Sequence, residues 1–304
     1  MSGGGGGAVP DLLRRIAERR RERLAEARGR EAGSGAAAAM SGAGAPALAM
    51  SAAAAAATAA PPESEPALLL PRDNPFLAAL THPAHAAHPA IIAEIKMGSP
   101  RLGSLQGRFD PLAQARAYAD NGAAALSVVV EPDFFFGSYQ LLADCRAASG
   151  LPAVAKDFVV DPLQLAWARS AGADAVLLIA ALYEPEELAR LARLARGLGL
   201  APLIETHDAG DLACLAGESW ELVGVNNRDL RTFEVDLERS IALLPSLPAE
   251  ALKVAESGIR DALDVALLAD SGFDALLVGE ALLLAADPAA QLRALLGGRE
   301  VGEG

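Results

Sequence analysis

From Ile91 to about Leu296, short apolar runs alternate along the chain with longer amphipathic segments. Eight of the apolar runs predict β-strands, at residues 91–96, 125–130, 152–155, 175–180, 201–204, 222–226, 253–255 and 275–278. The amphipathic segments predict helices, at residues 110–121, 138–149, 161–171, 184–197, 236–244, 260–271 and 287–296. Several of these segments begin with or just after an Asp-Pro pair, which is typical of helix N-termini.

The regular alternation of strand and helix sets the fold class. Parallel strands joined by helices make right-handed crossovers, so the pattern favours a parallel sheet. Eight such units within about 200 residues match a (β/α)8 TIM barrel. The alternative is a doubly wound open sheet, but no GxGxxG fingerprint follows the first run. We therefore predict an α/β TIM barrel with an extra N-terminal helix and a low-complexity linker.

The chain before the barrel has a different texture. Pro10 suits the first turn of a helix, and Leu12, Leu13 and Ile16 begin a partial apolar stripe after it. The following residues are rich in Ala, Gly, Pro and Ser, which favours a flexible linker. We divide the chain into a flexible tail, an N-terminal helix, a linker, the catalytic barrel and a C-terminal tail, at residues 1–9, 10–31, 32–66, 67–298 and 299–304.

Composition narrows the classes of partner and compartment. The formal net charge of −13 argues against nucleic acid or an anionic membrane as partner, although a local cluster of cations could still bind a small anion. Cys145 and Cys214 have no CxxC spacing, so we expect no disulfide framework or thiolate metal site and favour a reducing cytoplasm. The sequence shows neither a secretory signal nor an apolar run typical of a membrane span.

Charged residues end the first predicted strand. In a TIM barrel the catalytic groups come from the carboxyl ends of the strands and the loops after them. Glu94 and Lys96 are two residues apart, so a strand directs both side chains to one face. Ile91, Ala93 and Ile95 then point the other way, toward the helices. A Glu–Lys pair on the barrel axis is costly to bury unless it is paired or used.

Four other strands also end in polar residues. These are Lys156-Asp157, Glu205, Asn226-Asn227-Arg228 and Glu256-Ser257-Gly258. Of 26 basic residues only Lys96, Lys156 and Lys253 are lysine, and the first two stand at strand ends. Arginine stays protonated near neutral pH, whereas a buried lysine can serve as a proton donor. The alternative is that both are structural ion-pair partners or chance survivors of codon bias. Lys253 begins its strand, so we interpret it as structural.

Other motifs allow two interpretations. Gly258 and Gly279 follow the last two strands, where barrels often bind phosphate through backbone N–H groups, although glycine is common in such turns for plain geometry. The run 134–136 is Phe-Phe-Phe, which is either core or an apolar wall for an aromatic substrate, with Phe135 as our candidate contact. The histidines at 82, 85 and 88 are interpreted as solvated loop residues rather than metal ligands. His207 lies near the mouth, but nothing marks it as a base.

Several of these blocks occur together in one family. They are Ile92-Ala93-Glu94-Ile95-Lys96 with Ser99-Pro100, Phe134-Phe135-Phe136-Gly137-Ser138, Lys156-Asp157-Phe158, Leu203-Ile204-Glu205-Thr206-His207-Asp208, the block from Val225 to Phe233, Ala255-Glu256-Ser257-Gly258-Ile259 and Leu277-Val278-Gly279-Glu280. In this order they resemble the indole-3-glycerol-phosphate synthase family, from about residue 90 to residue 296. The helix at 10–31 also resembles an extra N-terminal helix of that family.

The resemblance implies a reaction and roles for these residues. The substrate would be 1-(2-carboxyphenylamino)-1-deoxyribulose 5-phosphate, which closes to an indole with loss of CO₂ and water, and no cofactor or metal would be needed. Lys156 would be the main general acid, and Lys96 would bind the substrate anion and act in the later dehydration. Glu205 would accept or donate a proton, and Glu94 would support it. Both lysines stand at the same mouth, so we expect their titrations to be coupled, and this leaves the division of roles between them open.

The remaining roles concern binding. By the same resemblance, Asn226, Arg228 and Ser257 would position the substrate. The phosphate would rest on Gly258, Gly279 and the N–H of Glu280, with help from Ser99. The partner would thus be a small anionic molecule with a phosphate and a carboxylate. We expect a monomer, with association with other tryptophan-pathway enzymes left open.

Two departures and two alternatives accompany the resemblance. Arg101-Leu102-Gly103 replaces the usual residues after Ser-Pro in a loop that closes over the substrate in the family, and Val130-Glu131 replaces a frequent Thr-Asp. A neighbouring phosphate-binding barrel is the second enzyme reading. Examples are phosphoribosylanthranilate isomerase and the tryptophan synthase α subunit. The isomerase would want a Cys near the end of the first strand and an Asp at the mouth, whereas here the first strand ends in Glu94 and Lys96. A catalytically silent barrel that binds a phosphorylated ligand or a partner protein is the third.

Overall fold

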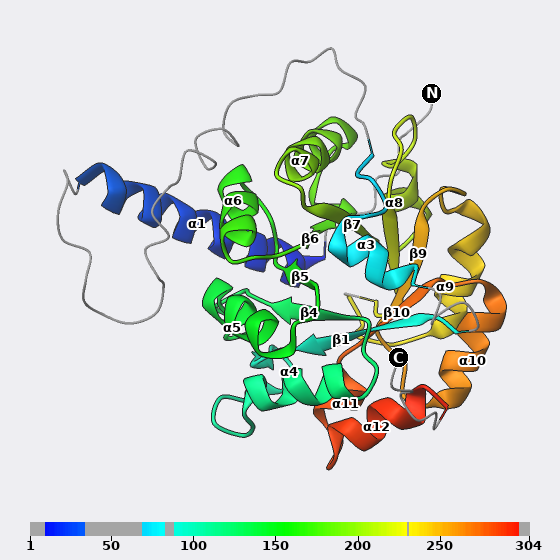
Figure 1. Ribbon diagram of the computed structural model, residues 1–304. Helices are drawn as coiled ribbons and strands as arrows, with labels where there is room; N and C mark the ends of the chain where they lie inside the picture. The colour runs from blue at the N-terminus through cyan, green and yellow to red at the C-terminus, as the bar shows by residue number, and fades with distance from the viewer. Residues whose placement is uncertain (1–9, 34–68, 83–87, 230, 298–304) are drawn as a thin grey trace.

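The barrel has the predicted strands in a closed parallel sheet. The computed structural model describes residues 10–33, 69–82, 88–229 and 231–297. Within them the strands close in the order β1-β10-β9-β8-β7-β6-β5-β4 (Figure 1). Their bounds are β1 Ala90–Ile95, β4 Ala125–Val129, β5 Ala153–Lys156, β6 Ala175–Ile179, β7 Ala201–Thr206, β8 Leu222–Asn226, β9 Leu252–Glu256 and β10 Ala275–Val278. The TIM-barrel prediction is confirmed. The predicted tails and all but the first two residues of the predicted linker lie outside the described residues.

An outer ring of helices covers the sheet. These helices are α4 Pro111–Asp120, α5 Tyr139–Ser149, α6 Pro162–Ser170, α7 Pro185–Gly197, α9 Leu237–Leu243, α10 Ala262–Ser271 and α12 Pro288–Leu295. The Asp-Pro pairs act as expected, since the side chains of Asp110, Asp161 and Asp287 accept hydrogen bonds from backbone N–H groups in the first turn. No helix in the described ranges is long and apolar enough to cross a membrane.

Several short elements were not predicted. They are α3 Pro75–Leu80, α8 Ala209–Ala213, α11 Glu280–Leu283, the 3₁₀ turns η2 Ala180–Leu182 and η3 Leu244–Ser246, and an antiparallel hairpin of β2 Gly98–Ser99 and β3 Gly103–Ser104. Elements this short do not complete a hydrophobic period, so periodicity cannot find them. Two of them matter for the site, because α8 begins just after β7 and α11 begins just after β10.

Alternation along the strands divides the core into two layers. Ile91, Ala93 and Ile95 belong to the layer between the sheet and the helices, as the spacing predicted. Ile92 and Leu277 belong to the second layer, which fills the barrel interior. The same alternation turns Glu94 to the inside, where its side chain is buried. The inner layer is apolar toward the amino ends of the strands, so the polar residues gather toward the carboxyl ends.

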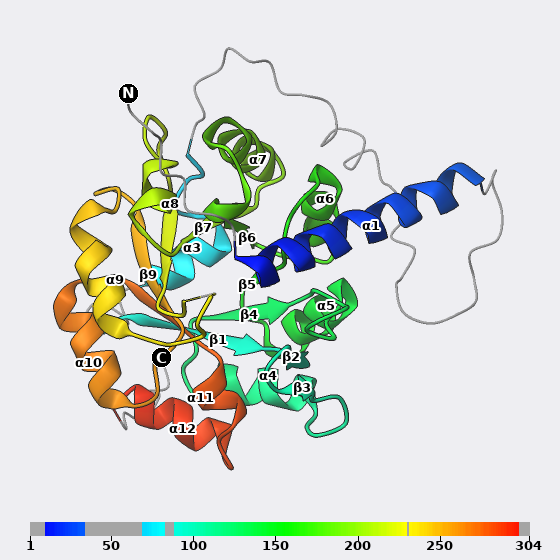
Figure 2. The ribbon, with the colours of Figure 1, turned by 180° about the vertical axis from the view of Figure 1, so that it is seen from behind.

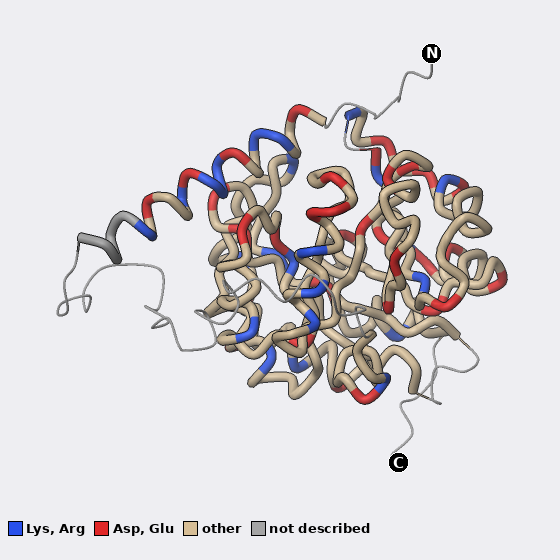
Figure 3. Tube along the Cα trace, turned by 90° about the horizontal axis from the view of Figure 1, so that it is seen from above, with Lys and Arg blue, Asp and Glu red and all other residues tan. Residues whose placement is uncertain are grey.

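The N-terminal helix α1 (Asp11–Gly33) lies across the barrel beside α5 and α6 and extends beyond them (Figures 1 and 2). Its buried apolar residues are Leu13, Ile16, Ala17 and Leu24. Acidic and basic residues alternate along the helix (Figure 3). Several of its arginines pair with acids of the barrel: Arg20 with Asp157, Arg23 with Asp133 and Arg28 with Asp161. The helix therefore docks through a short apolar stripe flanked by ion pairs.

Candidate active site

A cavity of about 970 Å³ opens at the carboxyl ends of the strands. All twelve residues that the sequence indicated for the site line it: Glu94, Lys96, Ser99, Phe135, Lys156, Glu205, Asn226, Arg228, Ser257, Gly258, Gly279 and Glu280. They come from β1, β5, β7 and β8 and from the loops after them and after β4, β9 and β10. The closed parallel barrel brings these seven segments to one rim, because it puts every carboxyl end on the same side.

Lys156 is held between two buried carboxylates. Its Nζ lies 2.9 Å from Oε2 of Glu205 and 2.9 Å from Oε2 of Glu256. Burial alone lowers the pKa of the Lys156 ammonium, but these two carboxylates and Glu94 outweigh it and raise the pKa above its usual value. Lys156 is therefore a protonated donor that is already oriented within the cavity.

The two carboxylates beside Lys156 differ in charge state. Burial raises the pKa of Glu205, but Lys156 and His207 reverse the effect, and the net pKa lies below the usual value. Burial and the neighbouring charge of Glu205 outweigh the attraction of Lys156 and raise the pKa of Glu256 from 4.5 to about 7. Glu205 is thus the ionised partner, and Glu256 is the carboxyl that holds a proton most readily.

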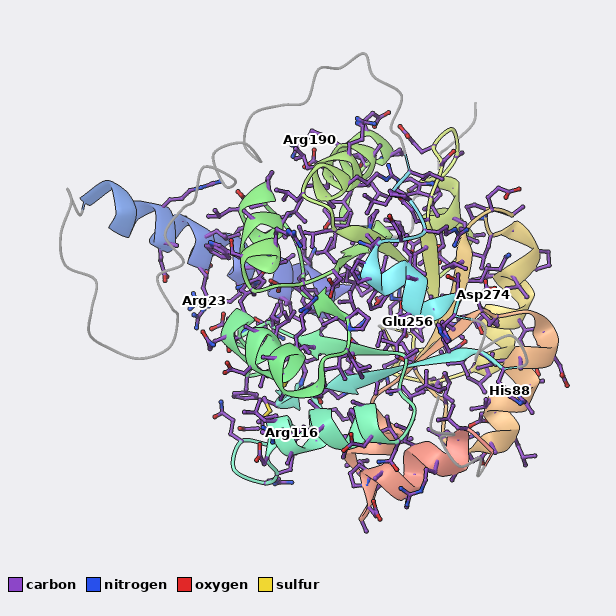
Figure 4. The ribbon with its side chains drawn as sticks, in the orientation of Figure 1. Arg23, His88, Arg116, Arg190, Glu256 and Asp274 are labelled. Carbon is purple, nitrogen blue, oxygen red and sulfur yellow. The ribbon has the colours of Figure 1, made fainter. Side chains whose placement is uncertain are left out.

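Our sequence-based prediction placed Glu256 at a strand end but did not include it among the candidate site residues. It is the last residue of β9 and lies among the strands of the barrel, whereas Arg116 and Arg190 lie on the outer helices (Figure 4). No group among the described residues hydrogen-bonds its buried Oε1, and a Cβ on Gly224 would lie 2.2 Å from that atom. Its place at the carboxyl end of a strand was the signal that could have identified it.

Glu94 and Lys96 form a second pair in the cavity. Lys96 Nζ donates to Glu94 Oε1 at 2.6 Å. Burial raises the pKa of Glu94, but Lys96 and Lys156 together lower it below the usual value. The carboxylate also lies against Gly279, where a Cβ would be 2.3 Å from Glu94 Oε1. Gly279 therefore makes room for Glu94, a packing reason for glycine that the sequence did not reveal.

The end of the cavity near β8, β9 and β10 is formed by backbone turns and two arginine side chains. Ser257 and Gly258 both have positive φ, at 68° and 84°. The Arg228 N–H donates to Asn226 Oδ1, and its guanidinium lies 3.3 Å from Glu280 Oε2. Arg101 of the β2–β3 turn also pairs with Glu280. The side chain of Glu280 is therefore engaged by two arginines, while its backbone begins α11.

An apolar wall faces these polar groups. Phe135 lies beside Phe158, with ring centroids 5.8 Å apart, and both line the cavity with Leu177 and Ile179. Phe135 therefore lines the cavity, and its contact with an aromatic substrate stays a prediction. The loop that carries it is fixed by the buried Glu131, whose carboxylate accepts the backbone N–H groups of residues 133, 134 and 135. The departure at Val130-Glu131 therefore gives a well-anchored loop.

The N-terminal helix completes the cavity. Leu12, Leu13 and Ile16 of α1 contribute to its lining. One turn further along, the buried Arg20 pairs with Asp157, the residue directly after Lys156. Tyr139 Oη and Gln164 Nε2 donate to the same carboxylate at 2.8 and 2.9 Å. Sequence reasoning missed Arg20, because 137 positions separate it from Asp157 and α1 has eight arginines to choose from.

His207 is the third residue that the sequence left without a role. Its Nε2 lies 3.2 Å from Glu205 Oε1, and its Nδ1 lies 3.1 Å from Asp211 Oδ2. Burial lowers the pKa of His207, but Asp211 and Glu205 together raise it from 6.5 to about 10. The imidazole next to Glu205 is therefore cationic near neutral pH.

Comparisons with known proteins agree with this geometry. The family model for indole-3-glycerol phosphate synthase matches residues 51–295. Three proteins named indole-3-glycerol phosphate synthase are similar to this chain. The protein from Azoarcus sp. is 46% identical, over 75% of this chain and 87% of its own length. The protein from Rhodopirellula baltica is 47% identical, over 68% of this chain and 80% of its own length, and the protein from Albidiferax ferrireducens is 44% identical, over 75% of this chain and 85% of its own length.

Solved structures with lower sequence identity share the fold alone. The 3-hexulose-6-phosphate synthase of Salmonella typhimurium superimposes with a TM-score of 0.55 at 16% identity, over 69% of this chain and all of the other. With a family model that matches most of the chain and relatives well above 30% identity, the assignment rests on sequence as well as on shape. The chain belongs to the indole-3-glycerol phosphate synthase family, whose members are carboxy-lyases of tryptophan biosynthesis.

Proposed function

We propose that this chain converts 1-(2-carboxyphenylamino)-1-deoxyribulose 5-phosphate to indole-3-glycerol phosphate, with release of CO₂ and water. The observation that carries the proposal is Lys156, whose ammonium projects into the cavity with carboxylates at 2.9 Å on two sides. The apolar wall next to it suits an aromatic ring, and the opposite end suits a phosphate. A phosphate-bearing small molecule is the substrate class of the family.

Lys156 acts as the general acid for ring closure. The ring carbon that carries the carboxylate attacks the ribulose carbonyl carbon, and the electron pair of the C=O bond moves to its oxygen. Lys156 protonates that oxygen, so no free alkoxide has to form. Loss of CO₂ then returns the electron pair of the C–C bond to the ring and restores its aromaticity. The ionised Glu205 stabilises the ammonium until the transfer, and in the later dehydration it accepts the proton that the adjacent carbon or nitrogen loses.

The later dehydration needs an acid and a base on either side of the new ring. The hydroxyl leaves as water when it is protonated, and a proton is lost from the adjacent carbon or nitrogen. Lys96 binds the substrate carboxylate and protonates the leaving hydroxyl, and Glu94 orients the Lys96 side chain through the 2.6 Å hydrogen bond. Asn226 and Ser257 position the substrate between the two lysines.

The phosphate binds at the end of the cavity formed by the last two strands. Gly258, Gly279 and the N–H of Glu280 bring backbone groups close to an anion there, with Ser99 from the facing turn. Arg228 offsets the charge of the anion and of Glu280, from which it is 3.3 Å away. A monomer, a cytoplasmic location and association with other tryptophan-pathway enzymes remain our expectations, the location supported by two free cysteines.

The experiment is a fluorescence assay of the indole product. Purified protein is mixed with the carboxyphenylamino-deoxyribulose phosphate, with and without a chelator, and product is followed with time. We expect turnover in both samples, because the acid and base groups are all side chains of the chain. A protein that binds this substrate without turnover is a silent barrel, and that result refutes the proposal. Turnover only without chelator refutes the metal-free mechanism.

A further inference from the structure

His207 contacts Glu205, the carboxylate to which our proposed function assigns proton transfer. It follows β7 and is two residues beyond Glu205, so both side chains lie on the same face of the strand. Its Nε2 lies 3.2 Å from Glu205 Oε1. His207 itself is largely buried and is not part of the cavity lining, so it contacts Glu205 and not the substrate.

The other side of the ring is clamped by Asp211 in α8. One carboxylate oxygen of Asp211 accepts both the backbone N–H of His207 at 2.8 Å and the ring Nδ1 at 3.1 Å. An ionised carboxylate only accepts hydrogen bonds, so Nδ1 carries a hydrogen. The ring is therefore fixed in orientation by its own backbone and by the first turn of α8.

Counting protons around Glu205 fixes the state of the second nitrogen. Glu205 Oε2 faces the Lys156 ammonium at 2.9 Å, and Oε1 accepts the amide of Asn226 at 3.2 Å. Both groups donate to Glu205, and the Lys156 ammonium outweighs burial and lowers the pKa of Glu205 below its usual value, so Glu205 is ionised. If Nε2 were bare, its lone pair would face a carboxylate oxygen at 3.2 Å, which is repulsive. Protonation of both ring nitrogens removes the conflict, although Nε2 approaches Oε1 outside good hydrogen-bond alignment.

We propose that His207 is a positioning residue that stays cationic between Glu205 and Asp211 and holds Glu205 as an ionised carboxylate facing Lys156. The idea rests on the proposed function, which assigns proton transfer to Glu205. It repeats, on β7, the arrangement of the Glu94–Lys96 pair on β1, where a cation two residues on also supports a carboxylate. Here the cation lies outside the cavity, so it orients Glu205 and favours its ionised form without binding the substrate itself.

The surroundings of Glu205 explain why a second cation is needed. Glu205 and Glu256 both contact the Lys156 ammonium at 2.9 Å, whereas Glu94 from β1 has Lys96 as its own partner, so two carboxyl groups share one buried ammonium. Burial, together with repulsion between the carboxyl groups, favours a proton on one of them, and the pKa of Glu256 is the one that rises, to about 7. The charge of His207 selects Glu205 as the group that stays ionised. Without it, the two carboxyls beside Lys156 would become nearly equivalent.

The first test reads the charge of His207 directly. The chain has four histidines, so ¹⁵N-histidine labelling gives few ring signals, and a His207→Gln variant assigns the one of interest. We expect both ring nitrogens of His207 in the wild-type protein to be protonated up to about pH 9, since its pKa is raised to about 10. Asp211→Asn removes one of the two anions, so this titration should move to lower pH. A neutral His207 at pH 7 overturns the proposal.

The second test is the pH profile of turnover. His207→Gln keeps an amide that can reach Glu205 but removes the charge. We expect kcat to fall about tenfold or more with a smaller change in KM, and the acid-side loss of activity to move up by about one pH unit or more, because the pKa of Glu205 rises. The matched control is His88→Gln, the same change at an exposed residue before the amino end of β1. A His207→Gln profile that superimposes on wild type overturns the role.

The two tests separate this inference from the function beneath it. Absence of wild-type turnover refutes the proposed function but leaves the NMR result on His207 intact. Wild-type turnover with a neutral His207 refutes only the positioning role. If His207→Gln does not fold, the wild-type and Asp211→Asn titrations still decide the charge, because an unshifted titration in Asp211→Asn contradicts the clamp.

Discussion

Replacing Arg20 by Met measures what the docking of α1 contributes to the site. Arg20 and Asp157 are 3% and 1% exposed and form an ion pair. Asp157 is the residue that follows Lys156 in the chain. Met keeps much of the length and apolar contact of Arg but leaves the Asp157 carboxylate without a cation. Removing one partner of a buried ion pair costs about 3–5 kcal/mol. The Tyr139 hydroxyl and the Gln164 amide still donate to Asp157, so we expect about 3 kcal/mol, the lower end.

The lost ion pair lies where α1 meets the carboxyl end of β5, next to Lys156, so we expect the lost stabilisation to lower kcat/KM. Each 1.36 kcal/mol is a factor of ten in rate, so a loss of about 3 kcal/mol lowers kcat/KM by about 100-fold if all of it falls on the transition state. The assay is the initial rate of product fluorescence, with thermal unfolding measured in parallel. Arg15→Met, an exposed arginine of the same helix, is the matched control. Activity of Arg20→Met within about threefold of the control refutes the reasoning.

Three further predictions concern the cavity itself. Lys156→Arg keeps the charge but removes the proton donor, so kcat should fall by about 100-fold or more at an unchanged melting temperature, and near-normal kcat contradicts general-acid catalysis there. The pKa of Glu256 is raised from 4.5 to about 7, so the folded state holds this proton more tightly than the unfolded state, and its contribution to stability is present below about pH 4.5 and lost as pH rises through 7. Glu256→Gln should therefore gain melting temperature relative to wild type at pH 8 but not at pH 4.5, and an equal difference at both pH values contradicts the raised pKa. In Gly279→Ala the new Cβ meets Glu94 at 2.3 Å, so turnover should drop about tenfold or more, whereas Gly197→Ala, with nothing within 4 Å, should retain wild-type rate.

The sequence was sufficient for the fold because its pattern is local. Every predicted apolar run became a strand within two residues of its expected bounds. The two-residue spacing of Glu94 and Lys96 fixed their common face before any contact was known. Residues at strand ends were also accessible to this reasoning, since a closed parallel barrel has only one rim where the carboxyl ends can meet. That is why the indicated strand-end residues line the cavity, whereas Ser99 was indicated by the family resemblance and Phe135 by the Phe run.

The partners within the site were not accessible in the same way. Lys156 pairs with Glu205 and Glu256, which are 49 and 100 positions away, and these pairings depend on strand order and on which rotamers reach across the barrel. Arg20 could not be separated from the other arginines of α1, because only docking turns it toward Asp157. His207 looked unremarkable until the first turn of α8 placed Asp211 beside it.

The chain alone thus determined the alternation of strand and helix, the number of barrel units, the face of each strand residue and the cluster of acids and lysines at one rim. Those properties depend on apolar residues recurring with a period of two in strands and about 3.6 in helices, and these periods can be read directly from the sequence. The tertiary structure decided which carboxyl beside Lys156 is ionised and which arginine is buried. A charge state depends on distances to all neighbouring charges and on exclusion of water, and both exist only once distant segments have packed together.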